Sequence, residues 1–142
     1  MEFFDVLVRY EVGLWAAIER ELSRQKLLGL GQLHALRVVD RYNGAARVQD
    51  LTEAIGITVG AASKLVDRLE RDGLVTRGPN PANRRSSLIT LTAVGRESLS
   101  TAADVAEAVV GRATAGQDLP SLTAALTRLQ VQLTELRTEV AA

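Results

Sequence analysis

Apolar residues recur at every third or fourth position over much of the chain, which is the spacing of one face of an α-helix. The first stripe runs from Phe4 to Leu22 and predicts a long helix, and the two glycines within residues 29–31 favour a turn after it. A second helix is expected to end at Asn43-Gly44, since both residues tolerate the left-handed conformation of a helix C-cap. Its inward-facing residues are predicted to be Leu33, Leu36, Val39 and Tyr42.

The middle of the chain has the pattern of two short helices joined by a tight turn. The first is expected over about Val48–Ile55 and the second over about Val59–Asp72. Gly56 lies in the turn, and Thr58 is a plausible N-cap for the second helix. Two helices joined in this way are the signature of a helix-turn-helix.

The hydrophobic period changes after Gly73. Residues 74–77 are predicted to form a short strand and residues 87–91 the returning strand. Residues 78–83 are expected to form a loop, because two prolines and a glycine exclude the interior of a ladder. The result is a hairpin with a long tip flanked by basic residues.

The last third of the chain is expected to be helical again. Thr92 can cap a helix that runs to about Thr114, residues 116–118 form a turn, and Pro120 fits the first turn of the final helix. That helix carries a heptad seam. Its members are Leu119, Leu122, Leu126, Leu129, Leu133, Leu136 and Val140. The predicted fold is therefore mainly α, with a small β-hairpin.

Composition excludes several classes of protein. The 142 residues are 46% apolar, which is enough to bury a core. The chain has no cysteine and a single histidine, so disulfides, zinc fingers and multi-histidine metal sites are excluded, and no cofactor is expected. No window approaches ~18 uninterrupted apolar residues, so no membrane partner is expected. The start of the chain lacks the basic residues of a signal peptide, which makes the cytoplasm the expected location.

Positive charge is concentrated in the middle of the chain. The 17 basic and 17 acidic residues cancel overall, but residues 58–85 carry six basic and three acidic side chains. A local excess of positive charge of this kind favours binding to nucleic acid.

The helix over residues 59–72 is two-sided. One face is apolar, and the other is small at its beginning and basic further on. Small residues let the backbone approach base edges, serine and lysine can hydrogen-bond to bases, and arginines and the capped N-terminus suit phosphates. The candidate DNA-contacting residues of this segment are Thr58, Gly60, Ala61, Ser63, Lys64, Arg68 and Arg71. A solvated amphipathic helix is the alternative, which the adjoining short helix and basic hairpin disfavour.

The tip of the predicted hairpin ends in Arg84 and Arg85. Two adjacent arginines on a loop could reach a narrow minor groove, where the negative potential attracts guanidinium groups. The alternative is a charged loop that keeps an edge hairpin from aggregating.

The chain resembles the MarR family of bacterial transcription regulators in four stretches that follow the family's order. These are LTEAIGIT (51–58), LVDRLERDGLV (65–75), NRR (83–85) and LTAVG (91–95). The order of elements matches nearly the whole chain, and the motifs cover about residues 48–97. In this family, by position, Ser63, Lys64 and Arg68 match recognition-helix contacts and Arg85 matches the arginine of the wing.

The resemblance implies a homodimer that binds double-stranded DNA at pseudo-palindromic operators and acts as a repressor. Residues 31–92 would form a winged helix-turn-helix, and residues 1–30 and 93–142 the helical dimerisation region. Family members are often released from DNA by a small molecule. Tyr10, Trp15, His34 and Arg37 could line a pocket for such an effector. The plainer interpretations are that Trp15 is core, His34 a partly exposed helix residue and Arg37 a salt-bridge partner.

Two residues depart from the expected pattern. The family's wing usually has Asp where this chain has Asn83, which removes a carboxylate beside the wing arginines and could loosen the wing. Gly60 lies within a predicted helix, where either close approach of the backbone to DNA or simple tolerance explains it. A winged helix used for protein–protein contact is the alternative function. An enzyme is disfavoured, because no nucleophile–base pair or glycine-rich phosphate loop is evident.

Overall fold

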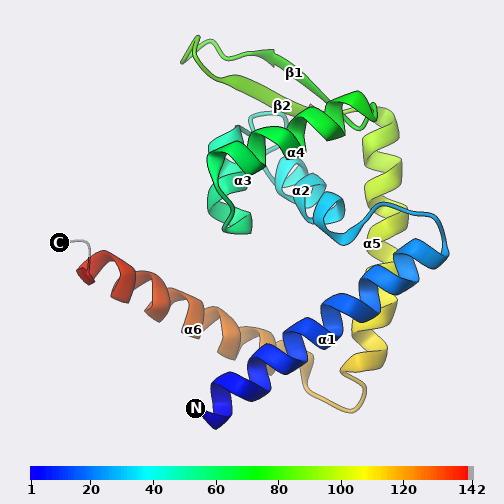
Figure 1. Cartoon of the computed structure of the whole chain (residues 1–142), viewed down its shortest axis with the longest axis vertical. Coiled ribbons are helices and arrows are strands. Elements are labelled where there is room, and N and C mark those ends of the chain that lie inside the picture. The colour runs from blue at the N-terminus through cyan, green and yellow to red at the C-terminus, as the bar shows by residue number, and fades with distance from the viewer. Residues whose placement is uncertain (141–142) are drawn as a thin grey trace. The chain divides into compact units, whose positions relative to one another are not determined.

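The computed structural model of the chain describes residues 1–140, with side chains as far as residue 136. Over this range the chain forms helices with one antiparallel hairpin, which confirms the predicted fold class (Figure 1). The elements are α1 (Glu2–Arg24), α2 (Leu30–Arg41), α3 (Val48–Ile55), α4 (Val59–Arg71), β1 (Val75–Pro79), β2 (Ser87–Leu91), α5 (Ala93–Ala113) and α6 (Leu119–Val140). The chain divides into two compact units, Met1–Val110 and Gly111–Ala142.

The first unit has a continuous hydrophobic core built around α2. This helix contacts α1, α3 and β2, and α4 packs against α3 and β1. Apolar residues at helical spacing therefore face one another across these contacts, as the pattern predicts. The largest fully buried side chains are Leu22, Leu33, Leu36, Val38, Val39, Leu51, Val66, Leu69, Val75 and Ile89.

Local chemistry defines both ends of α3. Gly56 ends α3 in the left-handed conformation, with φ of +73°. At the start of α3 the carboxylate of Asp50, which is 3% exposed, accepts a 2.7 Å hydrogen bond from the backbone N–H of Arg47. The Arg47 guanidinium lies 2.9 Å from the other carboxylate oxygen, and this pairing lowers the pKa of Asp50. The orientation of α3 is thus fixed by a charged cap.

Thr92 ties the start of α5 to the start of the hairpin. Its hydroxyl donates to the carbonyl oxygen of Gly73 at 2.7 Å and accepts from the backbone N–H of Gly95 at 2.9 Å. Its own N–H donates to the carbonyl oxygen of Leu74 at 3.0 Å. A Cβ atom on Gly95 would overlap that same carbonyl oxygen, so the close approach of α5 to the hairpin requires glycine.

The hairpin is longer than the sequence pattern predicts. Gly78 pairs with Leu88 and Pro79 with Ser87, so the expectation of a loop over residues 78–83 is wrong for its first two positions. Proline is tolerated at the end of an edge strand, and β1, which carries Pro79, is an edge of this two-stranded sheet.

Two aromatic residues that were expected inside are exposed. Tyr42 is 40% exposed, because α2 ends at Arg41 and the chain leaves the helical path at Tyr42. Trp15 is 44% exposed, because the buried part of α1 begins only at Ile18. Most of the apolar stripe of α1 before that point is also exposed. The exposed large apolar side chains of α1, on this stripe and beside it, are Phe3, Phe4, Val6, Leu7, Val8, Tyr10, Val12 and Trp15.

The second unit is dominated by α6. Asp118 caps this helix, because its carboxylate accepts from the backbone N–H of Ser121 at 3.2 Å and from the Ser121 hydroxyl at 2.6 Å. These bonds lower the pKa of Asp118. The six leucines of the predicted seam are exposed, from 40% at Leu119 to 60% at Leu133, and the side chain of Val140 lies outside the described residues. No helix within residues 1–140 is both long enough and apolar enough to cross a membrane.

Candidate nucleic-acid interface

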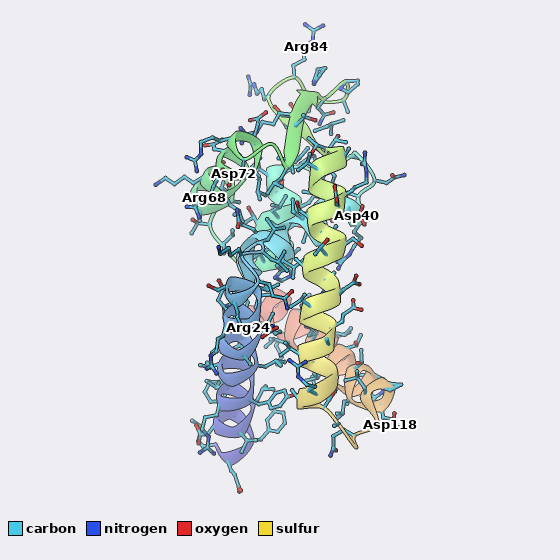
Figure 2. All side chains as sticks on the ribbon, turned by 90° about the vertical axis from the view of Figure 1, so that its right-hand side faces the viewer. Arg24, Asp40, Arg68, Asp72, Arg84 and Asp118 are labelled. Atoms are coloured by element: carbon cyan, nitrogen blue, oxygen red, sulfur yellow. The ribbon has the colours of Figure 1, made fainter. Side chains whose placement is uncertain are left out.

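The two faces of α4 differ as the helical pattern predicts. Ala62, Val66 and Leu69 are buried against the core. Of the residues predicted to contact DNA, Gly60, Ala61, Lys64, Arg68 and Arg71 are exposed and Ser63 is partly buried. The labelled Arg68 side chain points away from the ribbon in Figure 2. The outward face of α4 therefore carries small residues first and long cationic residues afterwards.

The N-terminus of α4 is open and capped. The Thr58 side-chain oxygen accepts from the backbone N–H of Ala61 at 3.2 Å, which confirms Thr58 as the N-cap. The hydroxyl proton of a capping threonine is still available as a donor. A Cβ atom on Gly60 would meet no heavy atom within 4 Å. The first turn of α4 thus has room for the close approach of another molecule.

Two asparagines build the loop of the hairpin. The Asn83 side-chain oxygen accepts from the backbone N–H of Arg85 at 3.0 Å. Asn80, which is 9% exposed, donates to the Ser86 hydroxyl at 2.8 Å and accepts from the backbone N–H of Ala82 at 3.0 Å. Asn83 therefore shapes the tip through an oxygen that an aspartate would also offer. Sequence reasoning missed Asn80, although an asparagine between two prolines is a turn signal.

The cationic side chains fall into two groups. Among residues 1–136, Lys64, Arg68, Arg84 and Arg85 make no ion pair in the structure, and Arg84 projects from the tip of the hairpin (Figure 2). Arg77, which sequence reasoning counted only as part of the basic excess, is instead paired with two carboxylates of α4. The guanidinium of Arg71 lies 3.7 Å from Asp72.

The four predicted effector residues do not line the cavity between α2, α4 and α5 that is described below. Tyr10 and Trp15 are exposed on α1, and Arg37 of α2 pairs with Glu107 of α5 at 3.2 Å, as its plainer interpretation predicted. His34 is partly buried, and this burial, with Arg37 and Arg41 nearby, lowers its pKa.

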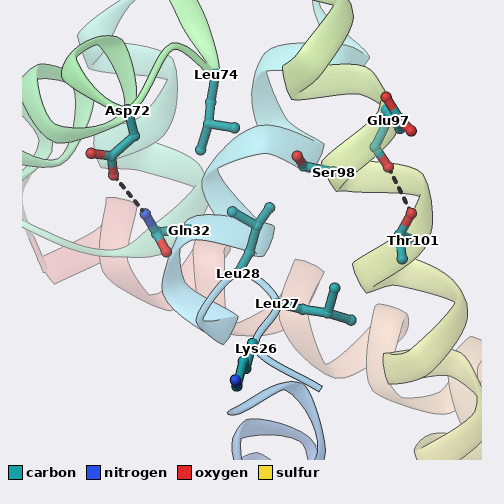
Figure 3. Close-up of a pocket in the computed structure, with 9 residues that line it drawn as sticks. All are labelled: Lys26, Leu27, Leu28, Gln32, Asp72, Leu74, Glu97, Ser98 and Thr101. Carbon is teal, nitrogen blue, oxygen red and sulfur yellow. Dashed lines mark hydrogen bonds between the residues drawn. The ribbon is translucent and has the colours of Figure 1, made fainter. Parts of the chain in front are cut away.

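A cavity of about 470 Å³ lies between the α1–α2 connection, the end of α4 and the first half of α5 (Figure 3). It is lined by Lys26, Leu27, Leu28, Gln32, Asp72, Leu74, Glu97, Ser98 and Thr101. Only the three leucines are apolar, whereas small-molecule pockets are lined mainly by apolar groups. The Gln32 amide donates to the Asp72 carboxylate at 3.4 Å across this cavity, which joins α2 to the end of α4.

Comparison with known proteins shows what this chain resembles. Residues 28–87 match the model of the MarR family. The uncharacterised HTH-type transcriptional regulator YfiV of Bacillus subtilis is 29% identical over 82 residues, which are 58% of this chain and 46% of that protein. The match thus spans less than half the length of this curated relative.

Solved structures show that the fold extends over almost the whole chain. A single-residue mutant of Escherichia coli MarR in complex with operator DNA has a TM-score of 0.78 at 19% identity, covering 94% of each chain. Bordetella bronchiseptica BpsR, whose DNA binding is regulated by 6-hydroxynicotinic acid, has a TM-score of 0.75 at 24% identity, covering 90% of each chain. The chain thus matches the MarR family model over its helix-turn-helix and the hairpin, and shares the fold of these solved structures over almost its whole length.

Proposed function

We propose that this protein is a homodimeric transcription regulator, acting as a repressor, that binds pseudo-palindromic sites on double-stranded DNA. Helix α4 enters the major groove, and the hairpin tip, residues 78–87, reaches the minor groove. The carrying observation is that Lys64, Arg68, Arg84 and Arg85 project from these two elements without an ion-pair partner among residues 1–136. Unpaired cations on exposed elements are what phosphate binding requires.

We assign DNA binding and dimerisation to different parts of the chain. Residues 31–92 form the DNA-reading region, and residues 1–30 and 93–142 form the dimerisation region. The exposed apolar side chains of α1 and of α6 support this division, since large exposed apolar patches mark association surfaces. A two-fold dimer would present its two α4 helices to half-sites about 34–36 Å apart.

Control by a small molecule is part of the proposal. It is supported by BpsR, whose DNA binding is regulated by 6-hydroxynicotinic acid. Tyr10, Trp15, His34 and Arg37 stay predictions for the effector site. We further infer that the protein acts in the cytoplasm and has no enzymatic activity, because the family that it matches consists of transcription regulators.

Capture of genomic DNA tests the proposal directly. Sheared DNA from the source organism is retained on the immobilised protein at about 150 mM salt, a physiological ionic strength, and is then sequenced. We expect a few enriched sites that share an inverted repeat. Recovery that is uniform over the genome, or no recovery, would contradict a sequence-specific dimer.

Replacing cations on the two elements should have different effects. Arg85→Ala is expected to weaken binding to most sequences and to lower the slope of log affinity against log salt by about 1, because a minor-groove or phosphate contact is lost. Lys64→Ala is expected to weaken binding to the enriched sites more than binding to random duplexes. Fluorescence anisotropy at several salt concentrations measures both. Unchanged affinity and slope in Arg85→Ala would remove the wing from the proposal.

The variant Gly60→Ala tests whether the glycine is needed for close contact with DNA or is only tolerated in the helix. The new methyl group meets open space, so the change should raise the free energy of unfolding by about 0.5 kcal/mol. It should nevertheless weaken DNA binding, because the first turn of α4 approaches the bases. Gly31→Ala is the matched control, since Gly31 is also the second residue of its helix and also faces open space. Equal DNA binding by the two variants would show that Gly60 is merely tolerated.

A further inference from the structure

The outward surface of α4 carries carboxylates as well as cations. Asp67 and Glu70 lie among Lys64, Arg68 and Arg71 on the helix that the proposed function places in the major groove. Their side chains are 62% and 41% exposed. Carboxylates at such positions repel phosphates within the Debye length of about 8 Å. A cation paired with these carboxylates would weaken that repulsion.

Arg77 of β1 forms ion pairs with both carboxylates. One guanidinium nitrogen lies 2.7 Å from Asp67 Oδ1 and 3.0 Å from Glu70 Oε2. The backbone N–H of Arg77 also donates to Glu70 Oε1 at 3.2 Å. The Arg77 side chain is 27% exposed, so it is less accessible to solvent than either of its carboxylate partners. This placement suits a neutralising charge better than a phosphate contact.

We propose that Arg77 is a positioning residue for DNA binding, which offsets part of the negative charge of Asp67 and Glu70, holds both carboxylates in ion pairs and makes no contact with DNA itself. The inference rests on the proposed function of α4. With both carboxylates paired to Arg77, the outward face of α4 presents Lys64 and Arg68 as its unpaired charges. When Arg77 is removed, the face gains two free carboxylates close to the phosphates, and the loss of affinity exceeds that of one cation.

A double-mutant cycle tests this proposal with a random-sequence duplex library and with the sites enriched from genomic DNA. Arg77→Met is expected to weaken binding about tenfold or more in the wild-type background. In the background of Asp67→Asn with Glu70→Gln, the same change should alter affinity by less than about threefold, since no carboxylate remains to be neutralised. The Asn/Gln background itself should bind DNA at least as tightly as the wild type.

Two further variants serve as controls for this cycle. Arg71→Met removes one cation from the same helix, so its effect should be equal in both backgrounds. Arg77→Lys keeps the charge and should retain affinity within about threefold of wild type, which gives a second test if Arg77→Met does not fold.

Two results would overturn the inference while leaving the proposed function intact. An equal effect of Arg77→Met in both backgrounds would make Arg77 a direct DNA contact. A loss in the Asn/Gln background as large as that of Arg77→Met would make the ion pairs a mechanical tether of the hairpin. A wild-type protein that binds no DNA would overturn the proposed function and this inference together.

Discussion

Gly95→Ala is expected to lower the free energy of unfolding by about 3 kcal/mol, at the upper end of overpacking effects. The added Cβ would overlap the carbonyl oxygen of Leu74 and lie 2.9 Å from its carbonyl carbon. These are backbone atoms, so no side chain can rotate away to make room. The Leu74 carbonyl is also held by the 3.0 Å hydrogen bond from Thr92. Either α5 moves away from the hairpin or the Thr92 junction breaks.

Urea unfolding followed by circular dichroism measures this effect, with the same denaturant slope required of both proteins. Gly111→Ala is the matched control, because it makes the same substitution in the same helix where nothing lies within 4 Å. The control should be more stable than wild type, by up to about 1 kcal/mol. A Gly95→Ala protein as stable as the control would show that α5 and the hairpin are not in close contact.

The second large effect concerns association. Leu126→Glu combined with Leu129→Glu is expected to raise the dissociation constant of the proposed homodimer by about 1,000-fold or more. Each buried leucine contributes about 1.5–3 kcal/mol, and in a symmetric dimer each change occurs twice. The two side chains are 47% and 44% exposed in the single chain, so the subunit itself should stay folded. Sedimentation velocity over a range of protein concentrations gives the association state.

Gln130→Glu places one negative charge on α6 beside the seam, half of what the double variant adds, and should leave the dissociation constant unchanged. Circular dichroism checks that the helix content of both variants matches that of the wild type. A double-glutamate variant that sediments like the wild type at every concentration would show that the leucine seam of α6 is not the dimer interface.

Local chemistry explains why much of the fold could be predicted from the sequence. The Gly56 turn and the Thr58 cap depend on residues within four positions of each other. The Thr92 cap of α5 is equally local, and the structure confirms it. The length of the hairpin strands is predicted less well. Proline is excluded from central strands, but Pro79 lies at the end of an edge strand, where it is tolerated.

Features that depend on tertiary contacts escaped prediction. Helical spacing shows that Trp15 shares a face of α1 with other apolar residues, but not what covers that face. The pairing of Arg77 with Asp67 and Glu70 depends on the direction in which the chain leaves Gly73, where φ is +73°. The helical pattern predicts that the candidate DNA-contacting residues are exposed. It does not predict which cations pair with carboxylates and which stay unpaired, because those contacts depend on the tertiary structure.

At the tip of the hairpin, the shape of the turn and its charge depend on different atoms of the residue at position 83. Asn83 shapes the turn with its side-chain oxygen, through the bond to the backbone N–H of Arg85, and leaves the adjoining guanidinium groups out of that bond. Aspartate carries an equivalent oxygen, so exchange between the two residues preserves the turn and alters only its charge. The electrostatic strength of this wing can therefore be changed at one position, without rebuilding the loop that presents its arginines.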